Sequence, residues 1–166
     1  SGRSADLPDQ LSLVEVAELA RSREPMPEVY VTALAPSSTP DAPLEPGFAA
    51  AWWAAALVSA SPYADRLLPG FLIGGLLTED GNPLPALQAV ALLASAAPRG
   101  STLNQLALVD AEMVTAALWT PKSRNLVVVY AGVAARTVVL DCRGAGVPLA
   151  VRSRILGGDG KVQTAD

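Results

Sequence analysis

The chain has 166 residues and a formal net charge of −4, with 51% apolar and 17% charged residues. This length predicts one domain with a sizeable core, and the apolar fraction excludes intrinsic disorder for most of the chain. The sequence contains no histidine, one cysteine (Cys142) and two lysines (Lys122 and Lys161). These counts exclude Ser-His-Asp and Cys-His catalysis, an intramolecular disulfide and the usual zinc sites. We therefore expect neither a metal nor a cofactor.

The charge pattern also limits the partners and the location of the protein. The acidic balance and the scattered arginines argue against a nucleic-acid partner. The longest charge-free apolar stretch, residues 47–60, is shorter than the roughly 20 residues that span a membrane. The chain does not begin with Met, and no charged segment precedes an apolar one at its start. We expect a cytoplasmic domain with no membrane contact, excised or processed from a longer protein.

The first element that the sequence predicts is a helix over residues 11–24, after a polar and flexible segment at residues 1–10. Ser12 and Glu15 have the spacing of a capping box, and Pro25 prevents continuation of the helix. Apolar residues at helical spacing form the face that we expect to be buried: Leu13, Val16, Ala17 and Ala20.

A strand and an alanine-rich helix follow. Residues 28–35 alternate strong β-formers and predict a strand, and residues 36–47 hold four prolines and predict an exposed loop. Residues 48–60 predict a helix that is apolar nearly all round and therefore packed on several sides. Trp52 and Trp53 are adjacent on it and point about 100° apart. We expect one of them in the core and interpret the other as a candidate interaction surface.

The remaining elements alternate between strand and helix patterns. Residues 70–77 predict a strand, Asp80-Gly81 predicts a turn, and residues 85–97 predict a helix with Pro85 in its first turn. The sequence then predicts a strand at 105–109, a helix at 110–118 with Asp110 as N-cap, a hairpin of residues 125–131 and 136–141, an edge strand at 147–156 and a flexible tail at 157–166. This order predicts a single two-layer α/β (α+β) domain over residues 11–156.

Few residues outside the predicted helices and strands indicate a catalytic or ligand-binding function. The glycine-rich runs at 73–75 and 155–161 lack the spacing of a phosphate-binding loop. We therefore interpret the first run as a site of tight backbone packing and the second as part of a flexible tail. Cys142 has no histidine to act as its base, which favours an inert thiol. Four acids lie among turn-forming residues, where carboxylates are usually solvated rather than catalytic: Asp41, Glu45, Glu79 and Asp80.

Four stretches carry a resemblance to a known family. They are SLVEVAELARSREPMPEVYVTALAP (12–36), LEPGFAAAWWAAALVSA (44–60), FLIGGLLTEDGNPLPALQAVALLASAA (71–97) and LALVDAEMVTAAL (106–118). In the order of elements and the spacing of small residues they resemble the Lon protease proteolytic domain. That family's relatives include the N-terminal domain of ComM and magnesium-chelatase-like proteins and the C-terminal domain of RadA. The resemblance covers residues 11–118 and implies a fold of the ribosomal protein S5 domain 2-like type, with residues 125–156 as added strands.

The resemblance implies that the family's catalytic residues are missing. The position of its nucleophilic serine falls on Phe48, and that of its lysine falls within residues 88–91, from Gln88 to Ala91. The Thr and Glu of its T-G-E motif fall on Gly74 and Leu76. The chain therefore resembles a pseudo-protease, not an enzyme, and we expect it to act in protein–protein interaction or assembly of a larger complex. The rings and dimers of this family imply a protein partner or self-association.

Two alternatives stay open at this point. A Ser-Lys dyad needs no histidine, so a hydrolase with a relocated dyad through Lys122 is one alternative, with Ser59, Ser61 and Ser101 as candidate nucleophiles. An accessory module of a DNA-processing machine, implied by the similarity to RadA, is the other. The acidic balance argues against this second alternative.

Overall fold

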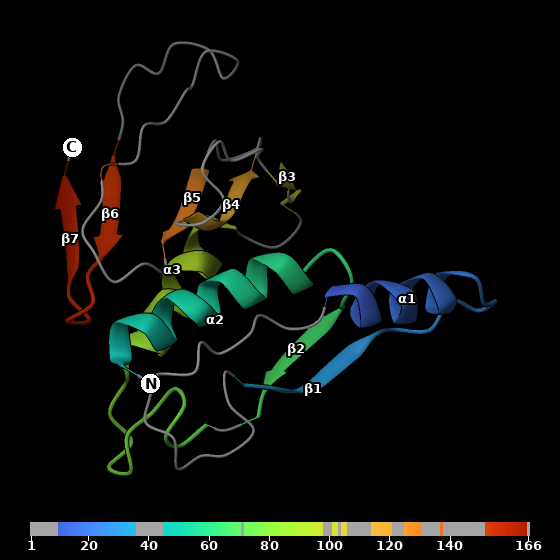
Figure 1. Ribbon diagram of the computed structural model, residues 1–166, viewed down its shortest axis with the longest axis horizontal. Helices are drawn as coiled ribbons and strands as arrows, with labels where there is room; N and C mark the ends of the chain where they lie inside the picture. Colours follow the sequence, from blue (N-terminus) through green and yellow to red (C-terminus); the bar gives the residue numbers. More distant parts are fainter. Residues whose placement is uncertain are drawn as a thin grey trace.

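The computed structural model describes residues 10–35, 45–70, 72–97, 101–102, 104–105, 114–120, 125–130, 137 and 152–165. In this part of the chain it is a mixed α/β protein with three helices and seven short strands (Figure 1). None of the described helices has the length and apolar character needed to cross a lipid bilayer.

The elements follow one another as helices and strands in the first half and as strands alone in the second. Their bounds are α1 Gln10–Arg21, β1 Tyr30–Leu34, α2 Pro46–Ala60, β2 Arg66–Pro69, α3 Pro85–Ala96, β3 Asn104–Gln105, β4 Val114–Thr120, β5 Asn125–Tyr130, β6 Ser153–Leu156 and β7 Val162–Ala165. The strands form a parallel pair β1–β2, an antiparallel sheet β3–β4–β5 and an antiparallel hairpin β6–β7.

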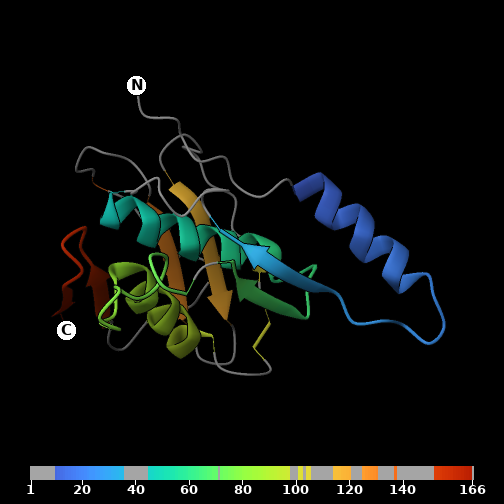
Figure 2. The same ribbon diagram turned by 90° about the horizontal axis from the view of Figure 1, so that it is seen from below.

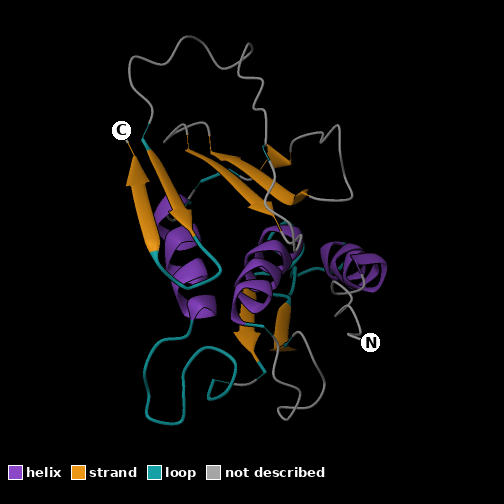
Figure 3. Cartoon of the chain, turned by 60° about the vertical axis from the view of Figure 1, so that its left-hand side comes forward, coloured by secondary structure: helices purple, strands orange, loops and turns teal. Residues whose placement is uncertain are grey.

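Helix α2 is the centre of the described structure. It contacts α1, α3, β4 and β5, and the strands β1 and β2 lie on its remaining side (Figure 3). Ala55 and Ala56 have no exposed surface, and Val58 is 2% exposed. The prediction that this helix is packed on several sides is confirmed. Small alanine side chains let neighbouring elements approach a helix axis closely.

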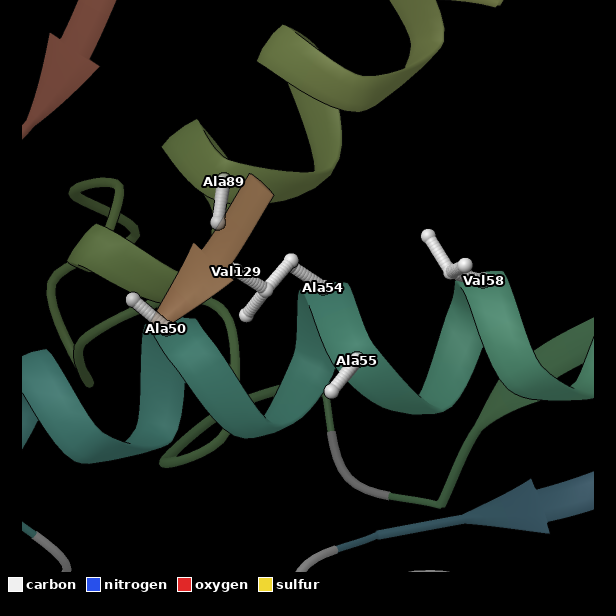
Figure 4. Packing of buried hydrophobic residues seen from close by; sticks show 6 residues of the cluster. All are labelled: Ala50, Ala54, Ala55, Val58, Ala89 and Val129. Atoms are coloured by element: carbon white, nitrogen blue, oxygen red, sulfur yellow. The ribbon is translucent and has the colours of Figure 1, made fainter. Parts of the chain in front are cut away.

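Two hydrophobic clusters lie against α2. In the first, Ala50 and Ala54 of α2 meet Ala89 of α3 and Val129 of β5 (Figure 4). The second lies towards β1 and β2 and consists of buried residues from four segments: Leu34, Trp52, Trp53, Ala56, Leu76 and Ala86. The core thus joins elements far apart in the sequence through one central helix.

The starts of α2 and α3 follow from local sequence. The Glu45 carboxylate caps α2 by accepting a hydrogen bond from the Phe48 backbone N–H at 2.8 Å, and proline occupies the first turn of both helices, where its missing N–H costs nothing. The predictions of these two helices, of the helix at α1 and of the strands at β1 and β5 are confirmed. The prediction of a capping box at Ser12 is wrong, because Ser12 lies inside α1 rather than before it.

The predicted strand at residues 70–77 is wrong. The strand in this region, β2, ends at Pro69, and the residues after it form turns that contain isolated bridges from Leu77 to Ile73 and to Pro83. Gly74 has φ +80°, a conformation that an extended strand does not contain. The predicted turn at Asp80-Gly81 is confirmed, with Gly81 at φ +80° and its N–H bonded to the Thr78 carbonyl at 3.0 Å.

The predicted helix at 110–118 is also wrong, since residues from Val114 onwards form strand β4. This strand pairs with β5 along its length, from Val114 opposite Tyr130 to Thr120 opposite Asn125. Sheet pairing overrides the helix preference of its alanines and leucine. Strand β5 therefore has β4 as a partner. Of its predicted partner segment, residues 136–141, the structure describes Thr137 alone, and Asp110 and the rest of residues 106–113 lie outside the described residues.

The predicted flexible tail is wrong for the residues up to Ala165. Residues 153–165 form the hairpin β6–β7, whose turn is closed by a hydrogen bond from the Gly160 N–H to the Gly157 carbonyl at 3.0 Å. This turn packs on the starts of two helices. A Cβ added to Gly47 would lie 2.7 Å from the Gly158 Cα, and one added to Gly160 would lie 2.9 Å from Pro85 Cγ. The glycines allow a close approach that periodicity does not reveal.

We predict that Gly47→Ala destabilises the protein by about 1–3 kcal/mol, the usual range for an overpacked site. The added methyl group would push the hairpin turn away from α2. The loss is expected even though alanine is a better helix former than glycine by up to about 1 kcal/mol.

The matched control is Gly158→Ala, whose added Cβ lies 3.9 Å from the Gly47 Cα, an ordinary contact distance. Urea unfolding of both variants measures the difference. Equal midpoints for the two variants would contradict the close packing of this turn.

Candidate functional site

The positions that the resemblance assigns to a catalytic dyad range from buried to exposed, and three of them pack on the hydrophobic clusters. Phe48 is the third residue of α2, and its half-buried ring packs on the second cluster. On α3, Val90 packs on the same cluster and Ala89 is buried in the first one. Gln88 is half-buried and Ala91 is exposed. These side chains contain one amide and otherwise only hydrocarbon, so they supply neither a nucleophile nor a base.

The titratable residues singled out from the sequence have structural or solvated positions where the structure describes them. Glu45 caps α2, and Glu79 and Asp80 are exposed in the turn before α3. The Lys161 side chain is 81% exposed, with Nζ 3.6 Å from an Asp159 carboxylate oxygen. An exposed ammonium next to a carboxylate is not desolvated, and a lysine base requires desolvation.

Three candidate residues lie outside the described residues: Asp41, Lys122 and Cys142. The relocated dyad through Lys122 therefore stays a prediction. Among the candidate serines, Ser59 is 6% exposed and buried within α2. Within the ranges that the structure describes, no group of three acidic or cysteine side chains is arranged to hold a metal ion.

The two tryptophans do not form an exposed surface. Trp52 and Trp53 are both 3% exposed, and their rings meet edge to face, with centroids 5.6 Å apart and an interplanar angle of 89°. Adjacent helical residues are both buried here because α2 is covered on more than one side. The interpretation of one of them as an interaction surface is therefore wrong.

A cleft of about 180 Å³ lies between α1, the segment before β1 and the connection from α2 to β2. Its charged groups are engaged in holding these segments together. Arg21 Nη2 donates to the Pro62 carbonyl at 2.9 Å, and the Val29 N–H donates to Asp65 Oδ2 at 2.7 Å. The cleft walls thus serve as attachments of α1 and β1 to the core, and they present no reactive pair.

Tyr30, at the start of β1, is half exposed and donates a hydrogen bond to the Glu28 carboxylate. This hydrogen bond and the negative charge of Glu28 raise the pKa of the Tyr30 phenol, while Arg66 acts in the opposite direction. The phenol therefore stays protonated at neutral pH, and an activated tyrosine is not available at this position.

The feature that the sequence analysis missed is the outer face of α1. Val16 is 52% exposed and Leu19 is 58% exposed, while Ala17 is 1% exposed and faces the body. The expectation that Val16 lies on the buried face is wrong, because the helix packs on α2 through its small residue. Leu19 was the available signal, since it is a large apolar residue that fits no position of the predicted buried face.

Comparison of the chain with protein-family models, with curated proteins and with solved structures found no match. At the positions where the resemblance places a serine and a lysine, Phe48, Ala89 and Val90 are packing residues. On α1, Val16 and Leu19 form an exposed apolar face.

The buried Trp53 indole yields a testable prediction. Its Nε1 has no hydrogen-bond partner in the described part of the chain, and a buried N–H without an acceptor costs free energy. We expect Trp53→Phe, which removes this N–H and reduces the ring, to lower the free energy of unfolding by less than about 1.5 kcal/mol. Trp53→Ala should lower it by about 3–5 kcal/mol through the cavity that it leaves.

Urea unfolding followed by far-ultraviolet circular dichroism compares the two variants without relying on tryptophan fluorescence. If the phenylalanine variant is as unstable as the alanine variant, the indole N–H has a stabilising partner and the prediction fails.

Proposed function

We propose that this chain is a non-catalytic domain that acts by protein–protein association, as a component of a larger assembly. The observation that carries the proposal is the exposed face of α1, where Val16 and Leu19 expose more than half of their surface. The two residues are three apart, so they lie on the same side of the helix.

The position of α1 fits an association element. The helix lies at the edge of the molecule, beside the start of β1 and one end of α2 (Figure 2). Ala17 is buried and Leu13, Val14 and Ala20 are half-buried, whereas Val16 and Leu19 stay more than half exposed. Burial of such surface is worth roughly 25 cal/mol per Å², and an amphipathic helix that lies against a partner is a common mode of recognition.

The non-catalytic part of the proposal is supported by how the described residues are used. Phe48, Ala89 and Val90 are packing residues. Of the titratable residues singled out from the sequence, Glu45 caps α2, Glu79 and Asp80 are exposed in a turn, and Lys161 is exposed beside Asp159. A reactive group needs a perturbed environment that changes its protonation or nucleophilicity. The described part of the chain offers no nucleophile beside a base.

We further propose that the domain descends from a Lon-like proteolytic domain. The order α1, β1, α2, β2, α3 supports this, as do the direct contact of α2 with α3 and the packing of Phe48 and Val90 on one cluster. The turns at residues 72–84 and the strand β4 depart from the elements that the resemblance implies. The association proposal does not depend on this ancestry.

We predict that Leu19→Asp abolishes association of the chain and leaves its fold intact. A charge at this position opposes burial against a partner, whereas an exposed substitution usually changes monomer stability by about 0.5 kcal/mol or less. Light scattering over a range of concentrations, together with pull-downs, measures the association.

The matched control is Ile155→Asp, since Ile155 is 59% exposed and lies on β6, away from α1. This variant should associate as the unmodified chain does. The proposal is wrong if the unmodified chain is a strict monomer without a protein partner, or if Leu19→Asp associates normally.

A further inference from the structure

The order of the charged residues along the outer face of α1 indicates which kind of partner this face can bind. Glu15, Leu19 and Arg23 are spaced four residues apart. Four residues turn an α-helix by 400°, so Glu15 and Leu19 lie about 40° apart on the helix surface. Arg23 is the second residue after α1, and it extends this stripe by one tightened turn, because the Ser22 N–H bonds to the Glu18 carbonyl and the Arg23 N–H to the Ala20 carbonyl, both at 3.1 Å.

This stripe, Glu15–Leu19–Arg23, is directed away from the core. Leu19 lies two residues beyond Ala17, which places it 200° around the helix from the buried side. Glu15 and Arg23 are exposed as Leu19 is. Arg21, the other arginine near this end, donates to the Pro62 carbonyl in the body of the protein. The positive charge on the outer face is therefore that of Arg23.

We propose that the partner of this stripe is a second copy of the chain, with its α1 packed antiparallel across a twofold axis at Leu19. This inference rests on the proposed function and names its partner. Because Glu15 and Arg23 are equally distant from Leu19, such an axis places each Glu15 opposite the Arg23 of the other copy. A parallel arrangement would instead bring like charges together.

The contact is self-complementary, as a twofold interface must be. The two Leu19 side chains meet at its centre, and Val16 of each copy extends the apolar strip beside them. Two oppositely charged pairs then flank the strip. In the described part of the chain neither Glu15 nor Arg23 has an ion-pair partner, so both charges are available for the contact.

The size of the contact sets its strength. Helix α1 has 12 residues, which corresponds to a length of about 18 Å. An interface of this size lies at the small end of specific interfaces, so the dimer is weak and depends on concentration. Exposed ion pairs contribute little singly, but reversing one charge replaces two attractions by two repulsions in the symmetric dimer.

The test uses the charge reversals E15R and R23E in the otherwise unmodified chain. Each variant alone places like charges opposite each other and should dimerise about tenfold or more weakly than the unmodified chain. A 1:1 mixture of the two variants should restore dimerisation, because the mixed pair has opposite charges at both ends of the contact. The double variant E15R/R23E should dimerise as the unmodified chain does.

Sedimentation equilibrium of the separate variants, their mixture and the double variant, with circular dichroism to confirm folding, measures these outcomes. Dimerisation of the mixture to the level of the unmodified chain supports the antiparallel contact. Failure of the mixture to recover overturns it, as does an unmodified chain that is monomeric at every concentration.

The two proposals fail in different ways. If the unmodified chain is a strict monomer but binds a different protein through Leu19, self-association is wrong and the proposed function stands. If neither self-association nor a partner sensitive to Leu19→Asp is found, both are wrong.

Discussion

The burial of α2 on every side is the constraint on which the rest of the described structure depends. No charged residue occurs between Pro46 and Ala60, and its alanines let α3, β4, β5 and the β1–β2 pair approach the same helix. A protein interior is packed at the density of an organic crystal, so the neighbours of α2 are placed by contact with its surface. The glycine contact at the start of α2 extends this arrangement to the β6–β7 hairpin, which packs there through its turn.

This constraint also decides where function can reside. Phe48, Trp52 and Trp53 are the most distinctive residues of α2, and each is used to fill the core. The same holds for Ala89 and Val90 on α3. The side chains at these positions pack the described core, and Val16 and Leu19 of α1 are among the large apolar residues that packing leaves exposed. A domain with a closed core and an uncovered helix is suited to association, which is the basis of both proposals.

Local sequence was sufficient wherever an element has a strong and long pattern. The helices α2 and α3 have proline in the first turn and a long, mostly apolar and alanine-rich sequence, which favours a helix over other structures. Whether the shorter segments form strands depends on the neighbouring strands with which they pair. Residues 110–118 carry helix-forming alanines, yet β4 forms from Val114 because β5 pairs with it as far as Thr120, with an irregularity between Val114 and Ala116. Residues 162–165 lack core residues, yet they pair with β6 across a glycine turn.

By itself, the sequence determined the mixed α/β class, the central apolar helix and the absence of histidine chemistry, because composition and periodicity act locally along the chain. It also determined that position 48 and residues 88–91 contain no serine and no lysine, since residue identity is enough for that. Tertiary structure alone decided that both tryptophans are buried and that Val16 and Leu19 are exposed. The physical reason is that a side chain is buried or exposed according to which neighbours cover it, and those neighbours come from distant parts of the chain.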